Sequence, residues 1–170
     1  MKTKVYINLN NFNDEWLCAT GELPAVVPFL TEQQKYKYLN RSDTPDIRKP
    51  VLETAIQFAP EHIELTSIED CDVVLLPFKY GHSDASPYIE EAKQAGKKII
   101  VIFNDDSTEP LNLGDDCIVL RTSFYKSSKK ENEYAMVPFC ADLYDSTKVM
   151  MKEEKPTISF CGGITHELRL

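Results

Sequence analysis

The segment Lys79–Asp84 holds the two side chains best suited to proton transfer, His82 and Asp84. An imidazole has an ordinary pKa near neutrality, and a carboxylate can accept a proton from a hydroxyl group within hydrogen-bond reach. Both residues are therefore candidates for a general base that activates a hydroxyl nucleophile. The competing interpretation is that Asp84 caps the following helix and that His82 is a solvated loop residue.

A second polar group follows the first predicted strand, Lys4–Leu9, in which Val5, Ile7 and Leu9 alternate with polar residues. Asparagines stand at positions 8, 10, 11 and 13. Ligands of open α/β sheets bind beyond the carboxyl ends of the strands, where these amides are expected. We take Asn10 as a candidate binding residue, with simple turn chemistry as the alternative.

Two adjacent carboxylates, Asp105 and Asp106, follow the predicted strand Lys97–Phe103. Paired acids at a strand end can hold a divalent cation that is bound to a diphosphate. Turn and capping roles are the more common use of such residues, so we assign no metal site.

These candidates must be positioned by a strand–helix–strand unit in Glu69–Phe103. Asp72–Leu76 is a short apolar run without polar alternation, which suits a parallel strand covered on both faces. Ser86-Pro87 pairs a preferred N-cap with a residue suited to the first helical position, and Gly96 supplies a left-handed stop. Lys97–Phe103 is a second apolar strand, so the unit is one βαβ motif.

Further elements extend this unit into a sheet. Val51–Phe58 fits a helix that ends before Pro60. Apolar runs predict more strands at Lys4–Leu9, His62–Leu65, Cys117–Leu120 and Thr157–Cys161. We therefore predict an α/β fold, a Rossmann-like open, mostly parallel sheet with helices on both faces.

The overall composition excludes several classes of protein. The 170-residue chain has a formal net charge of −8, and no basic cluster runs beyond Lys126–Lys130, so nucleic acid is not an expected partner. The N-terminal stretch is too short and polar for a signal peptide, and no apolar run approaches a membrane span. The five cysteines are scattered without a C-x-x-C pair, as is typical of reduced core thiols. We expect a cytoplasmic protein.

Three segments, taken in order, resemble one family. They are DVVLLPF at 72–78, RTSFYKS with NEYAMVPF between 121 and 139, and KPTISFCGG at 155–163 followed by Arg169. The ordered set resembles the exostosin-like glycosyltransferases, whereas residues 1–70 match only in general pattern.

The resemblance implies a glycosyltransferase of the GT-B type, whose N-terminal half binds the acceptor and whose C-terminal half binds a nucleotide sugar. It divides the chain into an acceptor-side domain at 1–150 and the linker and first strand of a truncated donor-side domain at 151–170. The implied partners are a nucleotide sugar, a glycan or other hydroxyl acceptor, and a missing C-terminal half or partner chain. No cofactor is implied, metal dependence stays open, and this chain by itself is expected to be inactive.

The resemblance also assigns residues to the donor. Gly162 and Gly163 would let backbone N–H groups approach the donor diphosphate, beside the N-terminus of the next helix. Arg169 would bind the donor phosphates through two parallel hydrogen bonds, and His166 lies in the same loop.

Arg121 and Ser123 follow a predicted strand and are expected to contact acceptor or donor. A structural Arg121 that pairs with Glu133 is an equally good interpretation.

Two other functions remain open on the sequence. One is a non-catalytic Rossmann-like binding or assembly module that needs a partner chain to cover the Thr157–Cys161 strand. The other is a flavodoxin-like or response-regulator-like domain, for which Asp105 and Asp106 are a weak indication. That domain is expected to carry acidic residues near the first strand, where this chain has asparagines.

Overall fold

The computed structural model describes residues 1–10, 26–40, 49–105 and 107–136. The predicted donor-side segment 151–170 and the predicted strand Thr157–Cys161 lie outside these residues. The described elements, in chain order, are β1 (Thr3–Tyr6), η2 (Val27–Phe29), α2 (Glu32–Leu39), α3 (Lys49–His62), β2 (Ile63–Leu65), β3 (Val73–Leu75), α4 (Ser86–Gln94), β4 (Ile99–Phe103), β5 (Cys117–Arg121) and β6 (Glu133–Ala135).

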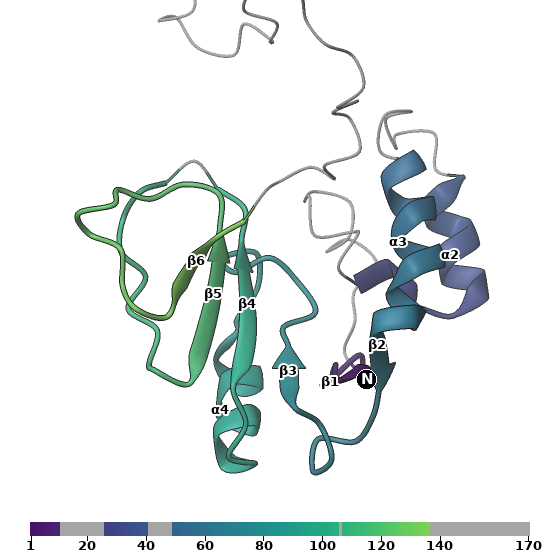
Figure 1. The fold of residues 1–170 in the computed structure, drawn as a ribbon, viewed down its shortest axis with the longest axis horizontal. Helices are drawn as coiled ribbons and strands as arrows, with labels where there is room; N and C mark the ends of the chain where they lie inside the picture. The colour runs from purple at the N-terminus through teal and green to yellow at the C-terminus, as the bar shows by residue number, and fades with distance from the viewer. Residues whose placement is uncertain (11–25, 41–48, 106, 137–170) are drawn as a thin grey trace, which may run out of the picture. The chain divides into compact units, whose positions relative to one another are not determined.

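The strands form one six-stranded sheet in the order β2-β1-β3-β4-β5-β6. Every pair of neighbours is parallel, and Figure 1 shows β3, β4 and β5 with their arrows in the same direction. From β1 the chain moves outward to β2, and it then returns past β1 to β3 and continues the other way. The order therefore reverses between β1 and β3, and the predicted open parallel α/β sheet is confirmed.

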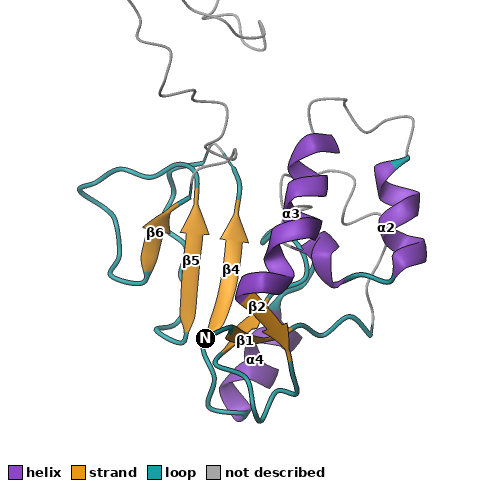
Figure 2. Ribbon diagram, turned by 45° about the vertical axis from the view of Figure 1, so that its right-hand side comes forward, coloured by secondary structure: helices purple, strands orange, loops and turns teal. Residues whose placement is uncertain are grey.

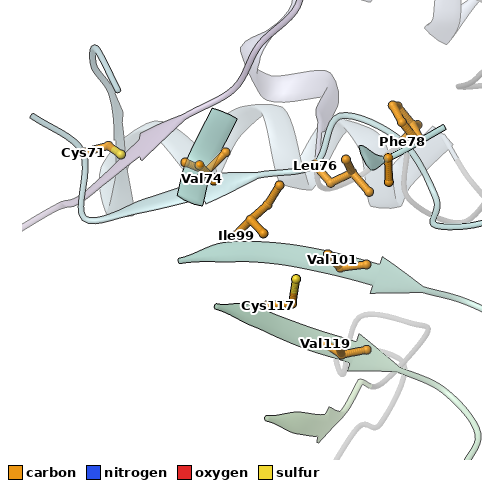
Figure 3. Close-up of a cluster of buried hydrophobic side chains, with 10 residues drawn as sticks. Cys71, Val74, Leu76, Phe78, Ile99, Val101, Cys117 and Val119 are labelled. Carbon is orange, nitrogen blue, oxygen red and sulfur yellow. The ribbon is translucent and has the colours of Figure 1, made fainter. Parts of the chain in front are cut away.

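Alternating side chains of the strands build two apolar layers. Val74 of β3, Val101 of β4 and Val119 of β5 face one side and pack with Ala92 of α4. Figure 3 shows the strand side chains of this cluster gathered together. Leu75 and Ile102 face the other side, where Phe29 of η2 packs against them together with Val5 of β1 and Ile7 just after it. Helical elements thus contact both faces, as the unbroken apolar runs predict.

Helix α4 covers the first face (Figure 1) and begins one residue earlier than predicted. Ala85, not Ser86, is the N-cap residue, and Ser86 is the first helical residue. The carboxylate of Asp84 accepts the Ser86 N–H at 2.9 Å, so an acceptor upstream of Ser86 takes over the expected role of its side chain. Gly96 has a φ of +66°, which confirms the predicted left-handed stop.

Helix α3 differs from the prediction at its C-terminal end. It continues through Pro60 to His62 instead of ending before the proline. A proline in the last turn removes only one N–H bond, here to the carbonyl of Ile56, and Pro60 lies exposed where its ring meets solvent. Leu52 and Ile56 of the same helix pack with Val27, so burial holds the turns before the proline, whereas Glu61 and His62 beyond it are exposed.

The described parts of the β4–β5 and β5–β6 connections are loops and turns (Figure 2). In a helix, backbone N–H groups would donate hydrogen bonds to the backbone carbonyls. In these two connections, side chains donate some of those hydrogen bonds instead. Lys130 Nζ donates to the Leu111 carbonyl at 2.8 Å, and Asn132 Nδ2 donates to the Cys117 carbonyl at 2.9 Å. The first bond joins the two connections and the second ties the β5–β6 connection to the start of β5, so both hold the chain that leads into the short edge strand β6.

Candidate functional site

The carboxyl ends of the parallel strands meet at one edge of the sheet, which we call the carboxyl edge. It is defined by the described loop residues 7–10 after β1, 76–85 after β3, 104, 105 and 107–109 after β4 and 122–124 after β5. Ligands of doubly wound sheets bind at this edge, where the strand order reverses. Here that point lies between the loops that follow β1 and β3.

His82 stands in a tight turn after β3. Its backbone N–H donates to the Lys79 carbonyl at 3.0 Å, and Gly81 has a φ of +92° at the third position of the turn. This conformation fits a type II turn, which requires a positive φ at that position. The Tyr80 N–H donates to the Ile102 carbonyl at 2.9 Å and anchors the turn to β4. The turn therefore presents His82 as an exposed side chain.

The exposed carboxylate of Asp84 is engaged with the start of α4. The hydrogen bond from the Ser86 N–H, with help from the Ser86 hydroxyl, holds the pKa of Asp84 below its usual range. A carboxylate with a lowered pKa is a weaker proton acceptor, and the bond serves the helix start. The geometry thus gives Asp84 the capping role that was the competing interpretation.

A contact between the loops after β3 and β4 was missed by the sequence analysis. Lys79 Nζ lies 3.4 Å from Asp105 Oδ2, and the other oxygen of this carboxylate accepts the Ser107 N–H at 2.9 Å. The Thr122 hydroxyl donates to the Asp105 carbonyl at 3.0 Å, which adds the loop after β5. Asp106 lies outside the described residues, within which no three His, Cys, Asp or Glu side chains are grouped to hold a metal ion.

Arg121 lies inside the protein, with 1% of its surface exposed. Its Nη1 donates to Glu133 Oε1 at 2.9 Å, and its Nη2 donates to the carbonyls of Ser107 and Glu109 at 2.8 and 3.1 Å. The guanidinium carbon is 5.2 Å from the centre of the Phe103 ring. This geometry is that of the structural arginine, and the side chain does not reach the carboxyl edge as a free cation.

Glu133 is equally buried, and its environment favours the charged form. Burial acts to raise the pKa of this carboxyl, but the Lys130 backbone N–H and the Arg121 guanidinium outweigh burial and lower it. The second oxygen of Glu133 accepts that Lys130 N–H at 3.0 Å. The carboxylate is therefore an anchor for the β5–β6 connection.

A further network at the carboxyl edge joins β1 to α4. Glu91 accepts hydrogen bonds from the Tyr6 hydroxyl at 3.1 Å and from Asn8 Nδ2 at 2.9 Å. The signal in the sequence is a carboxylate three residues after Tyr88 and one before Ala92, within the helix stripe that faces the sheet. A charged residue in such a stripe indicates a polar partner, which could have been sought on the neighbouring strand.

Of the remaining predicted binding residues, some lie within the described part of the chain and others lie outside it. Asn10 is exposed two residues beyond Asn8, and Ser123 is half-buried after β5. The donor-side predictions, namely Gly162, Gly163, His166 and Arg169, lie outside the described residues. Cys71 and Cys117 are free and buried, as expected for core thiols.

Within the described ranges, no helix combines the length and the apolar character that crossing a membrane requires. Comparison of the chain with models of protein families, with curated proteins and with solved structures yields no significant match.

Proposed function

We propose that this chain is the acceptor-side half of a GT-B-type glycosyltransferase of the exostosin-like kind, and that its carboxyl edge binds a glycan or another hydroxyl acceptor. The observation that carries the proposal is the reversal of strand order between β1 and β3. The loop with Asn10 and the turn with His82 follow the two neighbouring strands between which the order reverses, and such folds bind ligands at that point.

The chemistry of the carboxyl edge suits a polyhydroxyl ligand. Sugar hydroxyl groups both donate and accept hydrogen bonds, so their sites use amide, hydroxyl and imidazole groups together with an aromatic surface. Asn10 supplies an exposed amide, Ser123 a hydroxyl and His82 an imidazole. The ring of Tyr80, which packs edge-on against Phe103 at 6.2 Å, supplies an aromatic side chain held in place.

His82 is the base that we propose for the transfer step. It would take the proton from the acceptor hydroxyl while the hydroxyl oxygen attacks the anomeric carbon and the nucleotide diphosphate leaves. Asp84 is the weaker candidate because its carboxylate already accepts the Ser86 N–H. Donor binding would depend on the segments that the resemblance assigns to the second half.

Acceptor binding can be tested on the full chain by two-dimensional NMR. The ¹⁵N-labelled protein is titrated with maltose, cellobiose, lactose and N,N′-diacetylchitobiose. We expect at least one sugar to shift the amide signals of Asn10, Tyr80 and His82. Loss of affinity in His82→Gln, but not in His62→Gln, would support the site, because His62 is exposed at the end of α3. The proposal fails if no sugar binds, or if the shifts map to the opposite edge near Asp72 and Lys98.

The alternative is a non-catalytic Rossmann-like binding or assembly module. It is favoured by the structural bonds of Asp84 and Arg121, which withdraw both side chains from chemistry. Sedimentation of the full chain at several concentrations separates the two proposals. Concentration-dependent association without any sugar binding would favour the module.

A further inference from the structure

The carboxylate of Glu91 connects the second turn of α4 to the end of β1 and the residues that follow it. Its two oxygens are used by different donors, because Oε1 accepts from the Tyr6 hydroxyl at 3.1 Å and Oε2 from Asn8 Nδ2 at 2.9 Å. All three side chains are half-buried. A half-buried carboxylate destabilises the fold unless it is hydrogen-bonded, and here one oxygen has a donor from β1 and the other a donor from the loop after β1.

The Asn8 amide passes this constraint to the next residues of the loop. Its nitrogen donates to Glu91, while its oxygen accepts the backbone N–H of Asn10 at 3.1 Å. Both ends of the amide are therefore occupied, and its orientation is fixed. The bond from Asn8 to the backbone two residues later is an Asx turn, which sets the direction of the chain as it leaves β1.

We propose that Glu91 is the positioning residue for the loop that follows β1, and that it places Asn10 at the point where the strand order reverses. The role of Asn10 toward an acceptor rests on the proposed function. The positioning itself rests on the three hydrogen bonds that link Tyr6, Glu91, Asn8 and the Asn10 backbone. Glu91 would not need to touch the ligand, since it acts through Asn8.

The test compares Glu91→Gln with Glu90→Gln in the full chain. Both changes remove one negative charge from the same helix, but Glu90 is exposed and accepts a bond from Gln94 on the outer surface. Glutamine at 91 keeps one acceptor oxygen for two donors. We expect Glu91→Gln to shift the side-chain NH₂ signals of Asn8 and to speed hydrogen exchange of the Asn10 amide by about tenfold, as loss of one hydrogen bond would do. Glu90→Gln should change neither.

Two further variants keep the test decisive if Glu91→Gln proves too unstable. Glu91→Asp retains the charge but shortens the side chain, so it should behave like Glu91→Gln if position matters. Asn8→Ala removes the same link from the strand side. It should give the same faster Asn10 exchange, with no further increase in the double variant. Wild-type exchange of Asn10 in Glu91→Asp, or in Asn8→Ala, would overturn the inference.

Sugar binding provides the second readout. If a disaccharide from the NMR panel binds, Glu91→Gln should weaken it by about tenfold, and Glu90→Gln should leave it unchanged. Equal affinity in the two variants would overturn the link between Glu91 and the site. If no sugar binds, the proposed function fails by itself, while the exchange rate of the Asn10 amide still decides the positioning role.

Discussion

Arg121 and Glu133 form a buried ion pair between two neighbouring strands, with 2.9 Å between Nη1 and Oε1. Each residue has 1% of its surface exposed. The same guanidinium holds the carbonyls of Ser107 and Glu109, while the same carboxylate holds the Lys130 N–H. One pair therefore secures both the connection that precedes β5 and the connection that follows it. In most α/β units a crossover helix serves this purpose.

Removing the charge of Glu133 should destabilise the protein. Glu133→Gln leaves the guanidinium of Arg121 buried without a countercharge, so we expect the free energy of unfolding to fall by about 3 kcal/mol. Urea unfolding of both proteins, followed by circular dichroism, measures the loss. The matched control is Glu131→Gln in the same connection, which is exposed and should change stability by less than about 0.5 kcal/mol. Similar losses in both variants would contradict the role of the ion pair.

The same carboxylate predicts how stability depends on acid. Burial acts to raise the pKa of Glu133, but the Lys130 N–H and Arg121 lower it below its ordinary value of 4.5. The stabilisation is therefore present above that value and is lost as the pH falls through the lower folded-state pKa. The stability difference between the wild type and Glu133→Gln should be constant near neutrality and should narrow in acid. A difference that stays constant into strong acid would contradict the lowered pKa.

The sequence predicts those elements of the fold that depend on neighbouring residues, and it misses those that depend on contacts between residues far apart in the chain. The apolar runs that became β3, β4 and β5 bury both faces, so local composition was sufficient. Strand β6 was not predicted, because its buried residue is Glu133, whose partner lies 12 positions away. The continuation of α3 past Pro60 adds only Glu61 and His62, which are both exposed, so no apolar pattern signals it and the usual rule for proline ends the helix too early.

The candidate site likewise has features that local sequence predicts and features that depend on residues far apart in the chain. The carboxyl edge follows from strand order, and the tight turn before His82 follows from Gly81. The bonds of Glu91 to Tyr6 and Asn8, and the contact of Lys79 with Asp105, join segments that are far apart in the sequence. The place of Glu91 in the helix stripe indicates a polar partner but does not say which residue supplies it. For Asp84 and Arg121, the sequence named both roles, and the geometry selected the structural one.

Tyr6 should make the protein sensitive to alkali. Burial, and then the hydrogen bond to Glu91 and the charge of that carboxylate, raise the pKa of its hydroxyl above the ordinary value of 10.0. The folded state therefore holds this proton more tightly than the unfolded chain. The stabilisation is complete below pH 10 and is lost as the pH rises through the folded-state pKa.

The wild type should lose stability as the pH rises above 10, and Tyr6→Phe should lose less of it over the same range. Urea unfolding at several alkaline pH values measures both losses. The control is Tyr125→Phe, because Tyr125 is 64% exposed and has little to lose on unfolding. An unchanged alkaline profile in Tyr6→Phe would show that the Tyr6–Glu91 bond does not couple to folding.

Gly81 should be required for the turn that presents His82. A Cβ at this position would meet no atom within 4 Å, so the cost of Gly81→Ala comes from its φ of +92°, where a side chain is strained. We expect a loss of about 1 kcal/mol in the free energy of unfolding, and a smaller loss for Gly81→Asn, since asparagine tolerates positive φ better. Gly114→Ala is the matched control, because a Cβ there also meets open space and no positive φ is required.

The two glycine variants also separate stability from binding. If His82 contacts the acceptor, Gly81→Ala should weaken sugar binding measured by NMR, because it disturbs the Lys79–His82 turn, whereas Gly114→Ala should not. Equal stability of the two variants would mean that the turn relaxes without strain. If Gly81→Ala and Gly114→Ala were equally stable and both bound sugar as the wild type does, the conformation of this turn would not position His82. The imidazole would then be a solvated loop side chain without a role in binding.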